Sequence, residues 1–324
     1  MKMIGLSLGT KMGNNEVLVK EALMGAEELG VEVEFIRVLD YDIRACRGCI
    51  ACAQSLFVGG DGKCVIKDDL HIIDEKILDC DGMIISAPVF VLGPHGLLKV
   101  MADRFGPSHD LAWRMEAKKI AAKQGKKGPD ERSFKPKVAG FISVGGASTP
   151  HWLSLGLPLM NLITFSSHFA VADQMQVTSI SKGSVLMNDD AIKRARKLGR
   201  NVAKFMGKPH EEVKWMGDEQ GTCPVCHSNL LTITDKNPVE CPICGISGTL
   251  KIVDGKIKVT FSKKEQARSR LTMAGKLEHW DELGQNFKFM AQQNPKELTK
   301  RKAKYIGYAE TKTRSKKRGE DNIM

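Results

Sequence analysis

The first two hundred residues alternate between two hydrophobic patterns. Short apolar runs of strand length occur at residues 2–8, 31–38, 82–87, 137–144 and 169–178. Between them, residues 16–29 and 189–206 each place apolar side chains on one helical face, and Asn188 is a candidate N-cap for the second. Five strands separated by helices predict a parallel, doubly wound α/β sheet. In such sheets, ligands bind at the carboxyl ends of the strands.

The pattern changes after about residue 210. Residues 222–261 contain short strand-like runs around paired cysteines, and their last part predicts a hairpin that turns at Asp254-Gly255. From residue 263 onward the chain is rich in Lys, Glu and Gln, and we expect its basic end to be disordered. We therefore expect three domains: a doubly wound domain at 1–210, a small cysteine-rich module at 211–262 and a helical, basic extension at 263–324.

The composition is that of a globular protein. Of the 324 residues, 42% are hydrophobic and 27% are charged, so a sizeable core can be buried. No run of eighteen apolar residues occurs, which argues against a membrane span. The sequence begins MKMIGLSLGTKMGN, which has the pattern of a strand and not of a secretory signal, so we expect a cytoplasmic protein.

The net charge of +11 comes from two segments. Residues 116–137 hold eight Lys and Arg against three acidic residues, and residues 296–324 hold ten against four. Such segments are usually solvated loops and tails, and less often they bind nucleic acid. We therefore expect no nucleic-acid partner, and a regulator that combines the zinc ribbon and basic tail with a redox-sensing domain stays an alternative.

Nine cysteines in a protein expected to be cytoplasmic indicate metal binding or redox chemistry and not a disulfide framework. Eight of them form two groups: Cys46, Cys49, Cys52 and Cys64, then Cys223, Cys226, Cys241 and Cys244. Cys80 stands alone, and we interpret it as a small buried residue.

The second cysteine group has the spacing of a zinc ribbon. The segments CPVC and CPIC are separated by fourteen residues, and each lies in a predicted turn beside a short strand. Two such knuckles supply four thiolates in a tetrahedron, as zinc requires. Iron in a rubredoxin-like site is the alternative. Since zinc has no redox chemistry, we expect this module to stabilise the fold or to dock a partner.

The first cysteine group, CRGCIACAQSLFVGGDGKC, indicates a different centre. Three thiolates with C-x2-C-x2-C spacing can cover one face of a [4Fe–4S] cluster, and a fourth on a glycine-rich loop can complete its ligands. A structural zinc site usually uses two separate knuckles, so it would not need the third close cysteine. We therefore favour a [4Fe–4S] cluster; redox thiols without metal, or zinc, stay open as alternatives.

Three loops follow predicted strands and should meet at one edge of the sheet. The first, SLGTKMGNN at 7–15, can close backbone N–H groups and hydroxyls on a phosphate, but it is neither a Rossmann nor a Walker A motif. The others are SAPVFVLGPHGLLKVMADRF at 86–105 and SVGGAST at 143–149. Together they suit a planar cofactor with a single phosphate, and FMN fits this description best.

In this order, the three loops and the first cysteine group resemble the NADPH-dependent FMN reductase family, and within it the iron–sulfur flavoproteins of anaerobes. The resemblance covers about residues 1–207 and implies a flavodoxin-like fold with FMN as cofactor. The cofactor-binding residues that it implies are Ser7, Thr10, Lys11, Asn14 and Asn15 in the phosphate loop, Pro88, Val89, Phe90, Val91 and Gly93 beside the flavin ring, and Gly145 and Gly146 at its other edge.

These observations predict an oxidoreductase that uses FMN and an iron–sulfur cluster. It would move electrons between NAD(P)H or ferredoxin and a carrier or small acceptor, and we expect a homo-oligomer. A metal-free FMN quinone or nitro reductase and a redox-sensing nucleic-acid regulator are the alternatives. We assign no catalytic acid or base, because the histidines of this half are interpreted as surface or structural residues: His95, His109, His151 and His168.

Overall fold

The computed structural model describes residues 1–147, 149–179, 181–236 and 238–309. The chain divides into a compact unit, Met1–Trp280, and a second unit, Asp281–Met324. The basic segment after residue 309, which the sequence predicts to be disordered, lies outside the described residues. The three domain boundaries expected from the sequence stay predictions.

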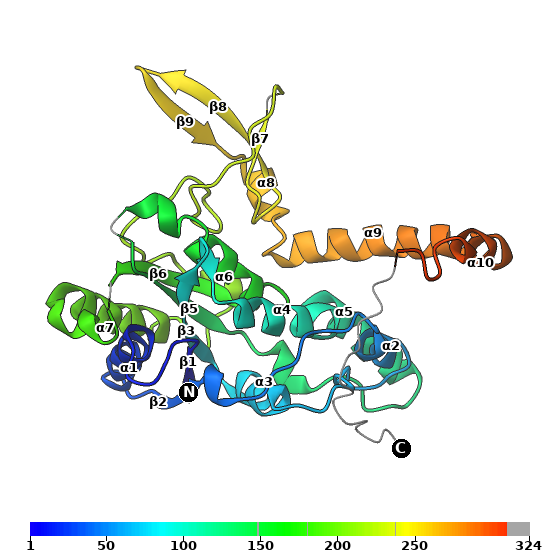
Figure 1. Cartoon of the computed structure of the whole chain (residues 1–324), viewed down its shortest axis with the longest axis horizontal. Helices are drawn as coiled ribbons and strands as arrows, with labels where there is room; N and C mark the ends of the chain where they lie inside the picture. Colours follow the sequence, from blue (N-terminus) through cyan, green and yellow to red (C-terminus); the bar gives the residue numbers. More distant parts are fainter. Residues whose placement is uncertain (148, 180, 237, 310–324) are drawn as a thin grey trace. The chain divides into compact units, whose positions relative to one another are not determined.

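The first unit is built on a parallel sheet with the strand order β2-β1-β3-β5-β6 (Figure 1). Its strands are β1 (Lys2–Ser7), β2 (Glu32–Arg37), β3 (Gly82–Phe90), β5 (Val138–Gly145) and β6 (Ala170–Thr178). This order is that of flavodoxin-like folds. All five strands expected from the sequence are confirmed. The sequence did not predict β4 (Gly93–Pro94), which pairs antiparallel with the end of β3.

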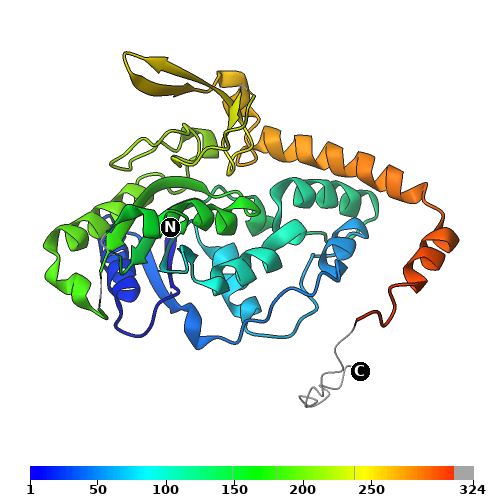
Figure 2. The same ribbon diagram turned by 45° about the horizontal axis from the view of Figure 1, so that its top comes forward.

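Helices cover both faces of the sheet (Figure 2). Helices α1 (Asn14–Glu27) and α7 (Asp189–Ala203) bury their apolar faces in one core. Helices α3 (Leu70–Asp79), α4 (Gly96–His109) and α6 (Gly156–Phe165) pack in the other. The predicted cap of α7 is confirmed, since the Asn188 side chain accepts the Ala191 N–H at 3.0 Å. The remaining α-helices are α2 (Ala51–Phe57), α5 (Leu111–Lys123), α8 (Lys263–Ala267), α9 (Met273–Ala291) and α10 (Pro295–Ala303).

Helices α1 and α7 pack unusually closely on each other. A Cβ atom on Gly25 would lie 2.1 Å from the Arg196 carbonyl oxygen, and one on Gly199 would lie 1.7 Å from the Ala22 carbonyl oxygen. Only glycine fits at both crossing points, because any side chain would collide with backbone. This contact fixes α7, and with it the loop after β6, against the helix that follows the phosphate loop.

The cysteine-rich module is a three-stranded antiparallel sheet. Its strands are β7 (Val239–Glu240), β8 (Ser247–Val253) and β9 (Lys256–Thr260). The hairpin turns at Asp254 and Gly255, with φ angles of 51° and 72°, as the Asp-Gly pair predicts. The small core contains the four cysteines with Ile246 and Phe261.

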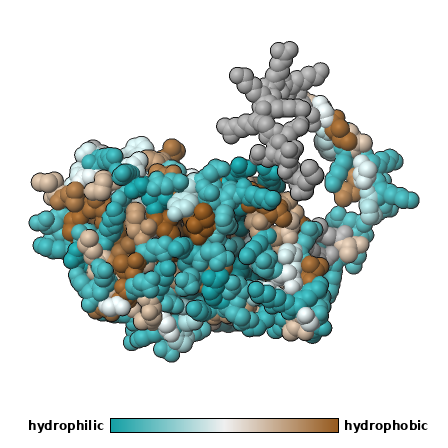
Figure 3. Space-filling model, turned by 90° about the horizontal axis from the view of Figure 1, so that it is seen from below, coloured by the Kyte–Doolittle hydropathy of each residue, from teal (hydrophilic) through white to brown (hydrophobic). Residues whose placement is uncertain are grey.

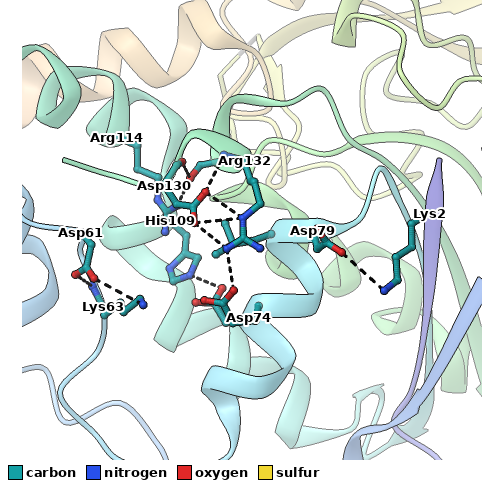
Figure 4. A network of polar contacts seen from close by, with 12 residues as sticks. Lys2, Asp61, Lys63, Asp74, Asp79, His109, Arg114, Asp130 and Arg132 are labelled. Carbon is teal, nitrogen blue, oxygen red and sulfur yellow. Dashed lines mark hydrogen bonds and ion pairs between the residues drawn. The ribbon is translucent and has the colours of Figure 1, made fainter. Parts of the chain in front are cut away.

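A network of polar contacts fixes the basic segment 116–137 to the sheet domain (Figure 4). His109 Nε2 lies 2.9 Å from Asp74 Oδ1, and Arg132 donates to Glu75 at 2.8 Å. Lys118 pairs with Glu131 at 2.6 Å within the segment itself. Several of the segment's cations are therefore compensated locally, which leaves less free charge for an external partner.

Among the described residues, no helix is both long and apolar enough to cross a membrane. The face shown in Figure 3 is mostly hydrophilic, with smaller hydrophobic patches between the polar residues. The expected cytoplasmic location stays a prediction.

Candidate functional site

A pocket of about 400 Å³ opens at the carboxyl edge of the parallel strands. Its lining comes from the carboxyl ends of the parallel strands and from the segments that follow β1, β2, β3, β5 and β6. The lining residues are Leu8, Gly9, Thr10, Gly13, Asn14, Asn15, Leu39, Pro88, Val89, Phe90, His95, Val144, Gly145, Gly146, Ser179, Ser181 and Lys182. Eight of the twelve cofactor-binding residues expected from the sequence are among them.

At one end of the pocket, the loop after β1 turns into the N-terminus of α1. The asparagine side chains there are engaged within the protein. Asn14 donates to the Ser181 carbonyl at 2.9 Å and accepts the Val185 N–H at 3.1 Å, while Asn15 accepts the Ser86 hydroxyl at 2.7 Å. The first-turn N–H groups of α1 have no acceptor within the helix, so they are the groups available to a phosphate.

Two residues that the resemblance places in the phosphate loop lie outside the pocket lining. Ser7 is fully buried, and its hydroxyl accepts the Gly9 N–H at 3.2 Å, which fixes the start of the turn. Lys11 is exposed. The pocket instead takes its cation from Lys182, in the loop after β6. The sequence analysis missed this residue, although a lysine just after the last strand was the available signal.

Glu16, in the first turn of α1, stabilises the loop between β1 and α1. Its carboxylate accepts the Met12 N–H at 3.1 Å, Lys20 Nζ at 2.6 Å and Arg37 Nε at 2.9 Å. Burial alone would raise the pKa of Glu16, but the hydrogen bonds from Arg37 and Lys20 outweigh burial and lower the pKa to about 2. The carboxylate is thus ionised, and its negative charge is balanced by Lys20 and Arg37. It therefore does not repel an anion at the N-terminus of α1.

At the other end of the pocket, β3 and β4 form a tight hairpin whose turn residues are Val91 and Leu92. Both have positive φ angles, 49° and 71°, which is the geometry of a primed turn that favours Asn-Gly. A β-branched residue in this region is strained. Val91 is nevertheless 97% exposed, so packing in the core does not account for it.

A second pocket of about 440 Å³ adjoins the first and is mainly apolar. It shares Val89 and Gly146 with the first pocket. Its lining is Val89, Val91, Leu92, Gly146, Ala147, Trp152 and Leu153. Gly145 allows the Leu153 side chain to line this pocket, because a Cβ on residue 145 would lie 2.0 Å from the Leu153 side chain. The exposed turn and Trp152 therefore form an apolar rim beside the end of the first pocket that Val89 and Gly146 line.

The four cysteines of the second group form a closed thiol site. All are buried, and their Sγ atoms lie within 4.8 Å of one another. The Cys223–Cys244 and Cys226–Cys241 pairs are 3.7 and 3.5 Å apart. A tetrahedral ion with metal–sulfur bonds of about 2.3 Å requires sulfur atoms about 3.8 Å apart, so this donor set fits zinc or iron. The site has the geometry that the ribbon motif predicts.

The cysteines of the first group lie on the segment 44–68 and are not gathered in this way. Cys46 and Cys49 are exposed, whereas Cys52 and Cys64 are half-buried. Within the described part of the chain, they do not belong to a group of ligand atoms close enough to hold one ion. Their role as cluster ligands stays a prediction. The lone Cys80 is buried as expected, and burial raises its pKa to about 12.

Comparison with known proteins identifies the family. Residues 1–177 match the family described as NADPH-dependent FMN reductase. A flavone synthase of Aspergillus candidus is 29% identical over 88% of this chain and 89% of its own length. An iron–sulfur flavoprotein of Methanocaldococcus jannaschii is 29% identical over 64% of this chain and 97% of its own. A solved flavone reductase structure superposes with a TM-score of 0.81 at 30% identity, covering 97% of this chain and all of that one.

The pocket also suits the cofactor of this family. A helix N-terminus and Lys182 lie at one end, where a single phosphate can bind. At the other end the loops are apolar, and a Cβ on Gly146 would meet nothing within 4 Å, so the glycine leaves space open. The chain therefore belongs to the NADPH-dependent FMN reductase family and is an FMN-dependent oxidoreductase.

Proposed function

We propose that this protein reduces a planar, conjugated carbonyl compound of the flavone type with electrons from NAD(P)H. The observation that carries this proposal is the apolar pocket next to the FMN pocket. Val89 and Gly146 line both pockets, so a molecule in the apolar pocket would lie beside the flavin ring. An aromatic acceptor needs such an apolar surface, because its rings lose water on binding.

The residues of the first pocket would hold the cofactor. The first turn of α1, with Thr10 and Lys182, would bind the phosphate, while the segments 88–90 and 145–146 would flank the ring. When bound, FMN supplies hydride chemistry between a nicotinamide and an acceptor. The chain's part is to orient the ring, to leave one side open to the acceptor and to exclude water with Val91, Leu92 and Trp152.

Two relatives favour this class of acceptor. The flavone synthase and the flavone reductase match nearly the whole of this chain, including the part beyond residue 177. The iron–sulfur flavoproteins match at most two thirds of it. The likeness to proteins that act on flavones thus extends over the C-terminal region as well as the flavin domain.

Purified protein loaded with FMN should oxidise NADPH or NADH anaerobically when flavone is added, and the product should carry two additional hydrogens. The variant V91N/L92G places the preferred residues in the primed turn, so it should melt at a higher temperature but show a KM for flavone at least tenfold higher. Ile252→Asn, at a residue 74% exposed on the ribbon hairpin, is the matched control and should change neither. No reduction of flavone, chalcone or a quinone by the wild type would disprove the proposal.

A second candidate function is electron transfer through a cluster on the segment 44–68. The specific observation is that this segment is held at its start by Arg104 and in its middle by the contact of Phe57 with Trp113, while Cys46 and Cys49 stay accessible. Iron–sulfur flavoproteins are among the relatives, which supports this candidate. Reduction of a one-electron carrier that depends on bound iron would distinguish it from hydride transfer to a flavone.

A further inference from the structure

His95 occupies the cap of helix α4 at the ring end of the FMN pocket. Its backbone N–H donates to the Pro88 carbonyl at 2.9 Å, and its carbonyl accepts the Leu98 N–H at 2.9 Å. Its ring Nδ1 accepts the Leu97 N–H at 3.1 Å. Ser, Thr, Asp and Asn are the residues that usually cap helices in this way. Capping alone therefore does not explain a histidine at this position.

The cap fixes the tautomer of the histidine. Because Nδ1 accepts a backbone N–H, the proton of the neutral ring is on Nε2. Burial lowers the pKa of His95, so the ring is neutral at pH 7. Within the described part of the chain, Nε2 makes no hydrogen bond to another protein group, and the residue lines the FMN pocket.

His95 is also separated from the pocket's other ionisable side chain. Among the described lining residues only His95 and Lys182 can carry charge, and Lys182 lies at the phosphate end with Ser181. His95 lies at the ring end, where its ring contacts that of Phe90 edge-on at 5.6 Å. This contact and the cap hold the imidazole in one orientation. The Nε2–H group is thus a fixed donor at the place assigned to the flavin ring.

We propose that His95 donates a hydrogen bond from Nε2 to the isoalloxazine ring of bound FMN and raises its reduction potential. The ring's heteroatoms gain negative charge on reduction, so a fixed donor stabilises the reduced cofactor more than the oxidised one. The proposal rests on the FMN chemistry of the family and not on the identity of the acceptor. Its failure would leave the proposed reduction of flavones untouched.

The test compares three variants that all preserve the cap. Ser, Asp and Asn are good N-cap residues, so His95→Ser, His95→Asp and His95→Asn should keep helix α4 and the thermal midpoint of the protein. Ser removes the long donor, Asp removes it and adds a negative charge, and Asn keeps a shorter amide donor. The expected order of midpoint potentials is therefore wild type, Asn, Ser and Asp, from highest to lowest.

Spectroelectrochemical titration of the FMN-loaded proteins measures this order directly. His95→Ser should shift the equilibrium toward oxidised FMN by at least tenfold, or about 30 mV for a two-electron couple. His151→Ser is the control, because this exposed histidine lines a separate groove and should leave the potential unchanged. For a variant with weak FMN binding, the ratio of Kd values for oxidised and reduced FMN gives the same quantity. Unchanged potentials in the Ser and Asp variants would show that His95 is only a helix cap.

Discussion

The two cysteine tetrads of this chain differ in spacing and also in structure. In the ribbon, all four thiols are buried and close enough to share one ion. In the segment 44–68, Cys46 and Cys49 are exposed, and the thiols do not gather. The comparison shows that closely spaced cysteines are gathered in advance only where the backbone around each cysteine turns the sulfur inward.

The local backbone explains the difference. In the ribbon, the His227 N–H donates to the Cys223 carbonyl at 3.0 Å and the Gly245 N–H to the Cys241 carbonyl at 2.8 Å, so each knuckle is a closed turn. In the other segment, helix α2 begins at Ala51 and includes Cys52, while Cys46 and Cys49 precede it. The thiols therefore lie on different local structures.

The segment 44–68 is instead held at two points, neither of which includes an exposed cysteine. At its neck, Arg104 donates to the Arg44 carbonyl at 2.8 Å and to the Asp68 carboxylate at 2.6 Å. At its far end, the Phe57 ring contacts the rings of Trp113 and Trp280, at 5.3 and 5.8 Å. Trp280 lies in the first part of α9, within the same compact unit as the cysteine segment.

The largest effect on stability should come from removing two of the four thiols of the ribbon. Replacing Cys223 and Cys226 by Ser should release one bound metal ion and unfold residues 222–261, because metal binding in such a module is folding energy, on the order of 10 kcal/mol. Elemental analysis should give about one zinc per wild-type chain and none in the variant, with FMN retained. Cys46→Ser is the control and should keep the zinc. Zinc retained in the double variant would contradict the ligand assignment.

The second prediction is that an iron–sulfur cluster, when supplied, gathers the thiols of the first group: Cys46, Cys49, Cys52 and Cys64. After anaerobic reconstitution, a [4Fe–4S] protein should contain about four irons and four sulfides per chain and absorb broadly near 400 nm. Cys49→Ser should remove that iron without loss of FMN, since the pocket proposed for FMN is lined by other residues. Wild-type protein without iron, with Cys46 and Cys49 readily alkylated, would rule out the cluster and leave these residues as free thiols.

The third prediction concerns the neck of the segment. The Arg104 and Asp68 side chains are nearly fully buried, so Asp68→Asn leaves an uncompensated buried cation and should destabilise the protein by about 3 kcal/mol. Hydrogen exchange should increase in residues 44–68 and not in the ribbon. Asp103→Asn breaks the exposed pair with Lys99 and should change stability by less than about 0.5 kcal/mol. Equal effects of the two substitutions would show that the neck does not hold the segment.

The sequence predicted those features that depend on local patterns. The apolar runs located all five parallel strands, and Asp254-Gly255 located the hairpin, because strand burial and turn geometry each have a local signature. Lys182 was missed because contacts from Asn14 bring its loop into the pocket. The Val91-Leu92 turn was missed because neither residue is typical of turns, and strain of this kind is visible only in the backbone angles.

His95 shows the same limit for a site residue. The sequence placed it in a loop, where a histidine is usually a surface residue. Only the structure shows that one ring nitrogen caps a helix and that the residue lines the pocket proposed for FMN. A sequence can indicate which segments meet at a sheet edge, but it does not show which ring nitrogen of His95 accepts the nearby Leu97 N–H and so which nitrogen carries the proton.

The smallest expected effect is the pH dependence of the neck. Burial alone would raise the pKa of Asp68, but the hydrogen bonds from Arg104 and the Arg44 N–H outweigh burial and lower it below the usual value of 3.8. A lowered pKa means that the folded protein prefers the ionised carboxylate. Asp68 therefore contributes its full stabilisation when the pH is above the usual carboxyl pKa of 3.8. That stabilisation is lost as the pH falls through the lowered pKa of the folded protein.

Hydrogen exchange in residues 44–68, corrected for its intrinsic pH dependence, should thus show the same protection at pH 7 and pH 5 and weaker protection once the pH falls below the usual carboxyl pKa of 3.8. Asp68→Asn should be unprotected at every pH, because an amide does not titrate in this range. The ribbon is not held by this carboxylate, so its exchange should not follow the same profile. If the segment lost protection between pH 7 and pH 5, a group other than Asp68 would have to hold its two ends together. The contrast between this segment, held by an ion pair, and the ribbon, with its four gathered thiols, would then need a different physical basis.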